Sequence, residues 1–265
     1  MSTAAKSAPP AKPPTRWKTA AVLIVIAGIT VWSAFGVHVD FAAIVDNWNN
    51  ASATIASLLQ PDYWFIPGTG QAVLETVQMA VIATAVSAAI SLPVAFLASR
   101  STNPNNSLLA AVRFIMNIVR SVPDLLYAAV LVSVVGTGAI SGIFALILFD
   151  FGIIVKLVSE AIDGLDVGPQ EAALSAGGSW FKADRVAMLP QVMPSFTSQV
   201  LYTFELNIRA STVIGLVGAG GLGMLIDRVR TFYRYHDLSL IILEILVIVV
   251  VIEFASSLLR KRLAR

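Results

Sequence analysis

The sequence predicts an all-α membrane protein with six membrane-spanning helices. Of its 265 residues, 57% are hydrophobic and only 13% are charged, whereas charged residues make up nearer a quarter of a soluble domain. Apolar runs long enough to cross a bilayer recur along the chain, separated by short polar, Gly- or Pro-containing segments. The absence of cysteine excludes thiolate chemistry and disulfides, and the net charge of +2 gives no basis for nucleic-acid binding.

Residues 1–18 are rich in Ala, Pro and basic residues, which predicts a disordered cytoplasmic tail. The apolar run 19–37 is about as long as a bilayer is thick and predicts the first transmembrane helix. A basic segment before an apolar run also fits a cleaved signal peptide. No clear A-x-A site follows, so we expect an uncleaved signal-anchor, with cleavage as the alternative.

The segment 38–71 contains aspartates but no Lys or Arg, together with the aromatic residues Trp48, Tyr63 and Trp64. Aromatic side chains favour the membrane–water interface. We therefore expect short amphipathic helices on the extracytoplasmic surface, ended by Pro67-Gly68.

The five further predicted spans are 72–98, 108–135, 142–158, 190–214 and 238–259. The third span of the chain, 108–135, is long and contains Pro123. Its residues Arg113, Asn117, Arg120 and Asp124 recur at helical spacing and share one face. This pattern fits a solvated face with an Arg120–Asp124 pair; the alternative is an inner-mouth lining or a partner contact.

Basic residues predict the orientation of the chain. Of the 18 Lys and Arg residues, fourteen lie on one side of the membrane in the predicted topology. Three lie on the other side, Arg228, Arg230 and Arg234, and Arg209 lies within a span. The basic side of a membrane protein is cytoplasmic. Both termini and the loop after the fourth span are therefore expected in the cytoplasm.

That loop contains the polar stretch EAALSAGGSWFKADRVAMLP, residues 171–190. It begins with small residues suited to a helix, continues with the pair Gly177-Gly178 and ends on Leu189-Pro190. A loop of this pattern, on the cytoplasmic side, predicts a docking element for a soluble partner.

The fifth span is too polar to face lipid on all sides. Its polar residues recur three and four apart along one stripe: Gln191, Ser195, Ser198, Tyr202, Glu205, Arg209 and Thr212. A charged side chain at bilayer depth normally faces protein or water, so the stripe favours a translocation path; polar contacts between helices are the alternative. Glu205 and Arg209 fit either an intrahelical pair or direct substrate contact.

The stretch 215–223 is GLVGAGGLG, with glycines at Gly215, Gly218, Gly220, Gly221 and Gly223. No strand precedes it and no GK[ST] occurs, so it is no P-loop. Close helix packing or a flexible gate is the better interpretation. No nucleophile–base arrangement is visible, and Glu244, deep in the sixth span, needs a partner that the sequence does not name.

The loop resembles the EAA loop of type I ABC importer permeases. Glu171-Ala172-Ala173, then Gly177 and Leu189-Pro190 stand at the family's spacing, although Ala187 replaces the usual Ile. Arg120-Ser121-Val122-Pro123 and the run NIRASTVIGLVGAGGLG resemble the phosphonate branch of that family. The methionine-type branch, which shares GAGGLG, is the runner-up.

The resemblance implies the type I ABC importer permease fold, with a permease core over 72–260 and a coupling loop at 160–190. It implies a cell-membrane homodimer with two cytoplasmic ABC ATPase subunits and an extracytoplasmic substrate-binding protein. ATP and magnesium would bind the ATPase, leaving this chain without cofactor or catalytic residues. The residues implied to couple to the ATPase are Glu171, Ala172, Ala173, Gly177, Leu189 and Pro190.

The expected cargo is a phosphonate or related phosphorus oxyanion, for which Arg209, Asn207, Ser211 and Thr212 have suitable chemistry. Methionine or another amino acid is the alternative cargo. A secondary transporter would show an internal inverted repeat, and none is visible. A membrane scaffold would have no need of the polar stripe.

Overall fold

The computed structural model describes residues 17–37 and 42–263, and all regular secondary structure in them is helical. Most of the predicted tail and residues 38–41 of the predicted outer segment lie outside the described residues. The chain divides into two units, Met1–Ala53 and Thr54–Arg265. The first unit contains α1 (Trp17–Gly36), α2 (Ala42–Asp46) and the start of α3 (Trp48–Leu58).

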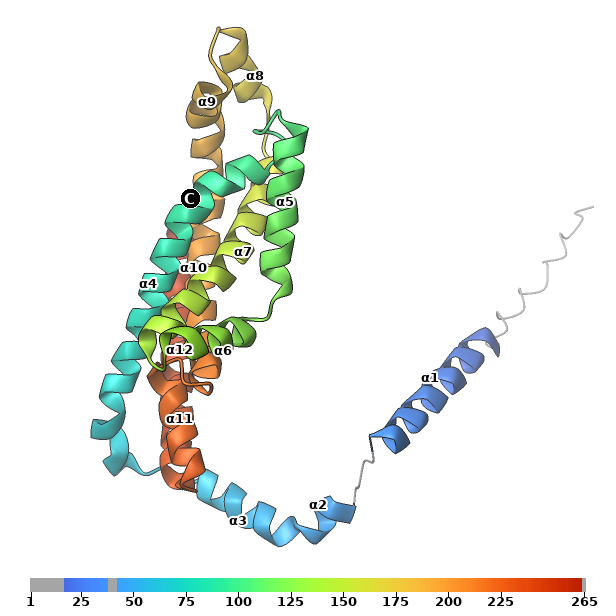
Figure 1. Cartoon of the computed structure of the whole chain (residues 1–265), viewed down its shortest axis with the longest axis vertical. Coiled ribbons are helices and arrows are strands. Elements are labelled where there is room, and N and C mark those ends of the chain that lie inside the picture. The colour runs from blue at the N-terminus through green and yellow to red at the C-terminus, as the bar shows by residue number, and fades with distance from the viewer. Residues whose placement is uncertain (1–16, 38–41, 264–265) are drawn as a thin grey trace, which may run out of the picture. The chain divides into compact units, whose positions relative to one another are not determined.

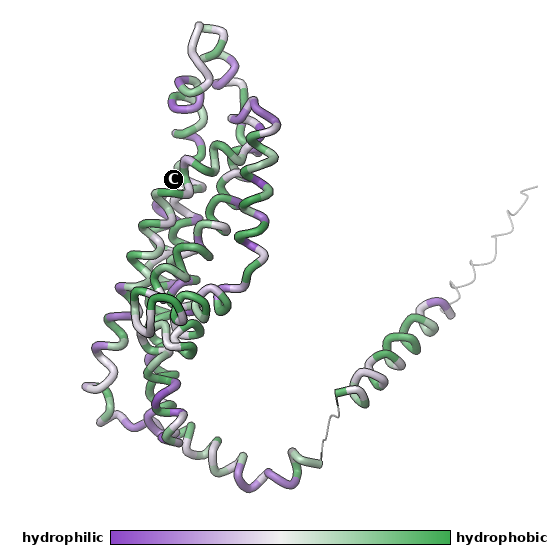
Figure 2. Tube along the Cα trace, viewed as in Figure 1, coloured by the Kyte–Doolittle hydropathy of each residue, from purple (hydrophilic) through white to green (hydrophobic). Residues whose placement is uncertain are grey.

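The second unit is a bundle of long helices. It contains the 3₁₀ turn η1 (Tyr63–Phe65), α4 (Ile66–Ala98), α5 (Asn106–Ser121), α6 (Asp124–Val135), α7 (Ala139–Asp163), α8 (Gly168–Ser175), α9 (Trp180–Ala183), the π-helix η2 (Asp184–Met188), α10 (Leu189–Gly215), α11 (Gly221–Thr231) and α12 (Tyr235–Leu263). Helix α7 packs along α4, and α10 packs against both of them, while α5 and α6 pack on α7 and α12 on α10. Figure 1 shows α8 and α9 together beyond one end of this bundle, and Figure 2 shows hydrophilic, neutral and hydrophobic residues mixed at this end.

Two of the four apolar core clusters in the described residues join α4, α7 and α10. Met79, Leu146 and Ile214 are buried where α4, α7 and α10 meet. Ile154 and Val192 belong to a second cluster, nearer the α8–α9 end, that joins the same three helices. Between membrane helices, where lipid tails are as apolar as these side chains, such packing stabilises the fold through van der Waals contacts. The position of α10 is therefore fixed by apolar packing on one side, whatever its other side faces.

The predicted third span, 108–135, is wrong as one continuous helix. It is a pair, α5 and α6, bent by 82° at the break. Val122 has an extended backbone with ψ 124°. Pro123 supplies no backbone N–H and disfavours a helical conformation in the residue before it, which explains the break.

The bend also removes the predicted Arg120–Asp124 pair. Asp124 begins α6, and its carboxylate accepts a hydrogen bond from the backbone N–H of Leu125 at 2.8 Å. Among the described residues, the five ion pairs do not include Arg120 with Asp124. The four polar residues therefore do not lie along one helix.

Pro67-Gly68 was predicted to end the outer segment, and this is wrong. Pro67 lies in the first turn of α4, where its missing N–H costs nothing and its fixed φ favours a helix. In the described part of the chain, four helices are long and apolar enough to cross a membrane, or five if the bent pair counts as one. The 27-residue α10 is not among them because it carries the polar stripe.

Candidate functional site

The loop between α7 and α10 is folded rather than extended. Its helix α8 begins at Gly168, three residues before Glu171, with Pro169 in its first turn. Glu171 lies in that first turn and is exposed, a position where a carboxylate is favoured by the helix dipole. Ala172 is also exposed, while Ala173 is half-buried.

Gly177 ends this helix in the left-handed region, with φ of 85°. Its N–H bonds the carbonyl of Leu174 at 2.9 Å, and the N–H of Gly178 bonds the carbonyl of Ala173 at 3.1 Å. Glycine suits such a helix end because it has no Cβ. Leu189 packs into the second apolar cluster and Pro190 is exposed in the first turn of α10.

Gln170 attaches α8 to the rest of the protein. Its side chain is 3% exposed, and Nε2 donates to the Ser101 carbonyl at 3.1 Å and to Asp184 Oδ1 at 2.6 Å. Burial raises the pKa of Asp184, and the hydrogen bond from Gln170 opposes that rise. The sequence prediction missed Gln170, although its place directly before Glu171-Ala172-Ala173 was a usable signal.

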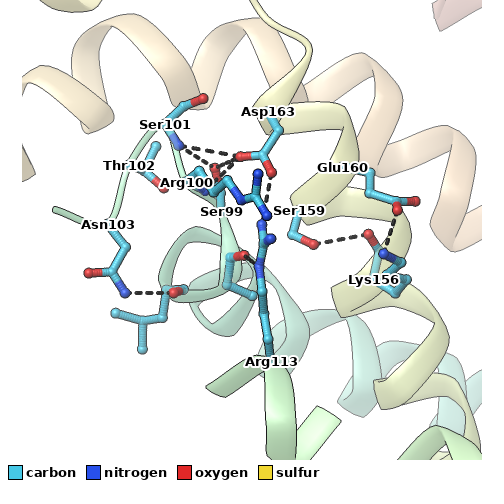
Figure 3. Close-up of polar contacts among 12 residues, drawn as sticks. Ser99, Arg100, Ser101, Thr102, Asn103, Arg113, Lys156, Ser159, Glu160 and Asp163 are labelled. Carbon is cyan, nitrogen blue, oxygen red and sulfur yellow. Dashed lines mark hydrogen bonds and ion pairs between the residues drawn. The ribbon is translucent and has the colours of Figure 1, made fainter. Parts of the chain in front are cut away.

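A second network lies where α7 ends. Asp163 Oδ1 accepts hydrogen bonds from Ser99 Oγ at 2.6 Å and from the backbone N–H groups of Arg100 and Ser101 at 2.7 and 3.3 Å. Its Oδ2 pairs with Arg113 at 2.9 Å. Figure 3 shows these groups converging on the carboxylate from the turn after α4 and from α5. We call this the Asp163 network; it fixes the end of α7, from which the loop leaves.

The polar stripe of α10 does not face a single environment. Tyr202 and Arg209 are exposed, Glu205 is only 6% exposed, and the rest are half-buried: Gln191, Ser195, Ser198 and Thr212. Glu205 pairs with Arg260 of α12 at 2.7 Å. An intrahelical Glu205–Arg209 pair is absent among the described residues, so that prediction is wrong. The Arg209 guanidinium has no ion pair or hydrogen-bond acceptor within the described chain.

Asn207 and Ser211 were considered for oxyanion contact, and both are fully buried. Asn207 Nδ2 donates to Asp150 Oδ2 at 2.5 Å and to Thr84 Oγ1 at 2.8 Å. This arrangement links α10 to α7 and α4 through polar side chains. Such a link between helices was the alternative interpretation for polar residues in the fifth span, and here it applies to the face opposite Arg209.

In the glycine-rich stretch, 215–223, backbone segments approach one another closely. A Cβ added to Gly215 would lie 2.6 Å from both the Gly220 carbonyl oxygen and Gly223 Cα. Gly218, Gly220 and Gly221 all have positive φ, and the N–H of Leu222 donates to Thr76 Oγ1 at 2.8 Å. Glycine is thus required here for backbone approach.

The partner of Glu244 is Thr69, whose hydroxyl donates to Glu244 Oε1 at 2.7 Å.

Comparison with known proteins adds relatives to this geometry. Residues 91–265 match the family model described as "Binding-protein-dependent transport system inner membrane component". The phosphite transport system permease protein PtxC of Stutzerimonas stutzeri is 34% identical over 92% of this chain and 90% of its own. The phosphate-import permease protein PhnE of Mycolicibacterium smegmatis is 41% identical over 72% of this chain, which spans only 36% of that relative.

Methionine-type proteins are more distant in sequence. A probable D-methionine transport system permease protein MetI of Vibrio cholerae is 28% identical over 69% of this chain and 85% of its own. The solved structure of the inward-facing MetNI methionine ABC transporter matches with a TM-score of 0.69, at 23% identity, over 77% of this chain and all of that one. At this identity the structural likeness concerns the fold.

Proposed function

This chain belongs to the family of binding-protein-dependent transport system inner membrane components, the type I ABC importer permeases, and we propose that it forms the translocation path of an ATP-driven importer for phosphonates or related phosphorus oxyanions. The observation that carries the importer role is the α8–α9 loop. It presents Glu171 and Ala172 on the outside of the bundle and is attached to it through Gln170 and the Asp163 network.

The proposed assembly contains a second copy of this chain, two cytoplasmic ABC ATPase subunits that bind ATP and magnesium, and an extracytoplasmic binding protein. Both termini lie in the cytoplasm in this proposal, with the α8–α9 loop on the same side. The distribution of Lys and Arg supports that orientation. The short exposed helix α8 has the small residues that allow a partner surface to approach closely.

Coupling would follow the attachments of α8. A displacement of α8 by the ATPase would act on Asp184 through Gln170, and on the turn after α4 through Ser101. Asp184 begins the π-helix that leads directly into α10. The helix that carries Tyr202 and Arg209 would therefore respond to movement of the loop.

The phosphorus cargo is supported by the relatives. The phosphite and phosphate-import proteins are 34% and 41% identical to this chain, against 28% for the methionine-type protein. Arg209, exposed on α10, has the chemistry to contact a tetrahedral oxyanion, since a guanidinium recognises such groups by paired hydrogen bonds. Methionine remains the comparison cargo, because the MetNI transporter shares the fold.

Reconstitution into liposomes tests this proposal. The chain, its ATPase and its binding protein are assembled together, and uptake of methylphosphonate, phosphite and methionine is measured with and without ATP. We expect ATP-dependent uptake of a phosphorus compound. Uptake that does not require ATP would refute the importer class, and ATP-dependent uptake of methionine alone would refute the proposed cargo.

A further inference from the structure

A charged pocket lies between α5, α7 and the turn after α4. Its volume is about 400 Å³, within the roughly 300–1,000 Å³ typical of ligand sites. The charged residues that line it are Arg100, Arg113, Arg120, Lys156, Glu160 and Asp163. We call it the α5–α7 pocket. None of the residues predicted for ATPase coupling or for the path on α10 lines it.

The α5–α7 pocket has more cations than anions. Arg113 pairs with Asp163 and Lys156 pairs with Glu160, as Figure 3 shows. Within the described chain, the guanidinium groups of Arg100 and Arg120 have neither ion pair nor hydrogen-bond acceptor. Two positive charges in one pocket are thus left without a counter-charge. Both residues are exposed, and an anion in the pocket would supply a counter-charge and hydrogen-bond acceptors.

The position of Arg120 is determined by the helix that it packs on. Gly152 of α7 is buried, and a Cβ at that position would lie 2.7 Å from Arg120 Cγ. The missing side chain provides the space in which the Arg120 stem lies. Lys156 follows one helical turn later on the same face of α7. Arg120 and Lys156 both line the wall of the pocket.

We infer that the α5–α7 pocket binds the phosphate-type oxyanion group of an anionic ligand. Arginine favours such groups because its planar donors pair with two oxygens at once. The inference rests on the proposed function for its orientation, which puts the pocket at the cytoplasmic end of the spans. Two sources have this chemistry: the headgroup of an anionic phospholipid, which basic pockets between membrane helices bind on that side, and a free phosphorus oxyanion in the cytoplasm.

The face of α5 that points away from the pocket-lining residues is apolar. Phe114, Ile115 and Ile118 are all more than half exposed, at 66%, 57% and 52%. A phospholipid whose headgroup occupied the pocket would extend its acyl chains into the bilayer around α5. A free oxyanion would need only the guanidinium groups of Arg100 and Arg120.

Binding to the purified complex of this chain with its ATPase tests the site. The probes are phosphatidylglycerol and inorganic phosphate, and bound lipid is counted by native mass spectrometry, with phosphate affinity measured by calorimetry. We expect Arg120→Gln to weaken binding of the effective probe about tenfold, as for loss of one charged hydrogen bond. Arg230→Gln is the matched control, because Arg230 pairs with Asp227 on α11, outside the pocket.

Arg120→Lys keeps the charge and should retain more binding than Arg120→Gln, which guards against a folding defect. If the wild-type complex retains phosphatidylglycerol and the Arg120→Gln complex does not, the pocket is a lipid site. A saturable phosphate affinity with the same sensitivity would establish a free-oxyanion site. If neither probe binds the wild type, or if Arg120→Gln binds like Arg230→Gln, the inference is overturned.

ATP-driven uptake by the same preparations separates this result from the proposed function. If the wild-type complex takes up a phosphonate but binds neither probe, the binding site in the pocket is refuted and the importer function stands. If binding depends on Arg120 but no uptake occurs, the binding site stands and the importer function is refuted.

Discussion

Replacing Gln170 by Leu tests how α8 is attached to the bundle. Leucine has a similar volume, so the change leaves the 3% exposed site filled but removes the hydrogen bonds to Ser101 and Asp184. A neutral hydrogen bond contributes about 1 kcal/mol to stability and one to a charged group about 1.5–3 kcal/mol. Because Asp184 is half exposed, solvent can replace part of that bond, and we expect a loss of ~2 kcal/mol in the stability of the loop.

The consequence for transport is uncoupling. With α8 released from Asp184 and from the turn after α4, ATP hydrolysis would continue while uptake falls several-fold. The measurements are the ratio of ATP hydrolysed to substrate taken up in liposomes, and the rate of limited proteolysis in the α8–α9 loop. An unchanged ratio together with unchanged proteolysis would refute the role of Gln170.

The defect should depend on pH through Asp184. Burial raises the pKa of this carboxyl in the folded protein, and loss of the Gln170 bond raises it further. A carboxyl whose pKa is higher in the folded than in the unfolded state destabilises the fold as pH rises through the interval between the two values. We therefore expect the stability deficit of Gln170→Leu to shrink at acid pH. Asp184→Asn is the matched control: it keeps an acceptor for Gln170 and should show no such pH dependence.

Three further substitutions address the loop, the path and the glycine-rich stretch, and a fourth, on α4, serves as a control. Gly177→Asp places a side chain at φ 85°, at a cost of about 1–3 kcal/mol, and should abolish ATPase association or coupling; normal substrate-stimulated ATP hydrolysis would contradict this. Arg209→Ala should lower uptake at unchanged membrane insertion, and a wild-type uptake rate at matched expression would remove Arg209 from the path. Gly223→Ala would bring a Cβ against the Thr212 carbonyl oxygen and should destabilise the protein by about 1–3 kcal/mol, measured as a lower thermal midpoint. Gly70→Ala, where a Cβ meets open space in a helix, should raise stability by roughly 0.5–1 kcal/mol; equal effects of the two alanines would contradict the packing argument.

The sequence predicted the helical class, and it predicted the ends of the first and fifth spans to within two residues, because these depend on local composition. The predicted spans 190–214 and 238–259 correspond to α10 (Leu189–Gly215) and α12 (Tyr235–Leu263). Pro123 is a local signal for the bend between α5 and α6. The prediction nevertheless joined the two helices into one span, because apolar residues lie on both sides of Pro123. Pro67 was wrongly predicted to precede the helix that it begins. A proline indicates a helix boundary, but it occurs both after helix ends and in first turns.

Side-chain partners could not be predicted from sequence spacing. Glu205 and Arg209 are one helical turn apart, a distance at which pairing is common. The structure instead brings Arg260, 55 positions later, to Glu205, because α12 packs on that side of α10. Gln170 and Asp163 were missed for the same reason, since their partners Ser101, Asp184 and Arg113 come from other elements.

Hydrophobic periodicity and loop composition are local properties, and from them the sequence predicts apolar helices with a polar loop at 171–190. Which polar residues face one another is known only from the tertiary structure. It placed Asn207 against Asp150 and Thr84 inside the bundle and left Arg209 outside. It also placed the stem of Arg120 against Gly152 and brought Arg120 and Lys156 into the lining of one pocket. These outcomes depend on how α4, α5, α7, α10 and α12 pack, and packing energies between distant segments have no signature in local sequence.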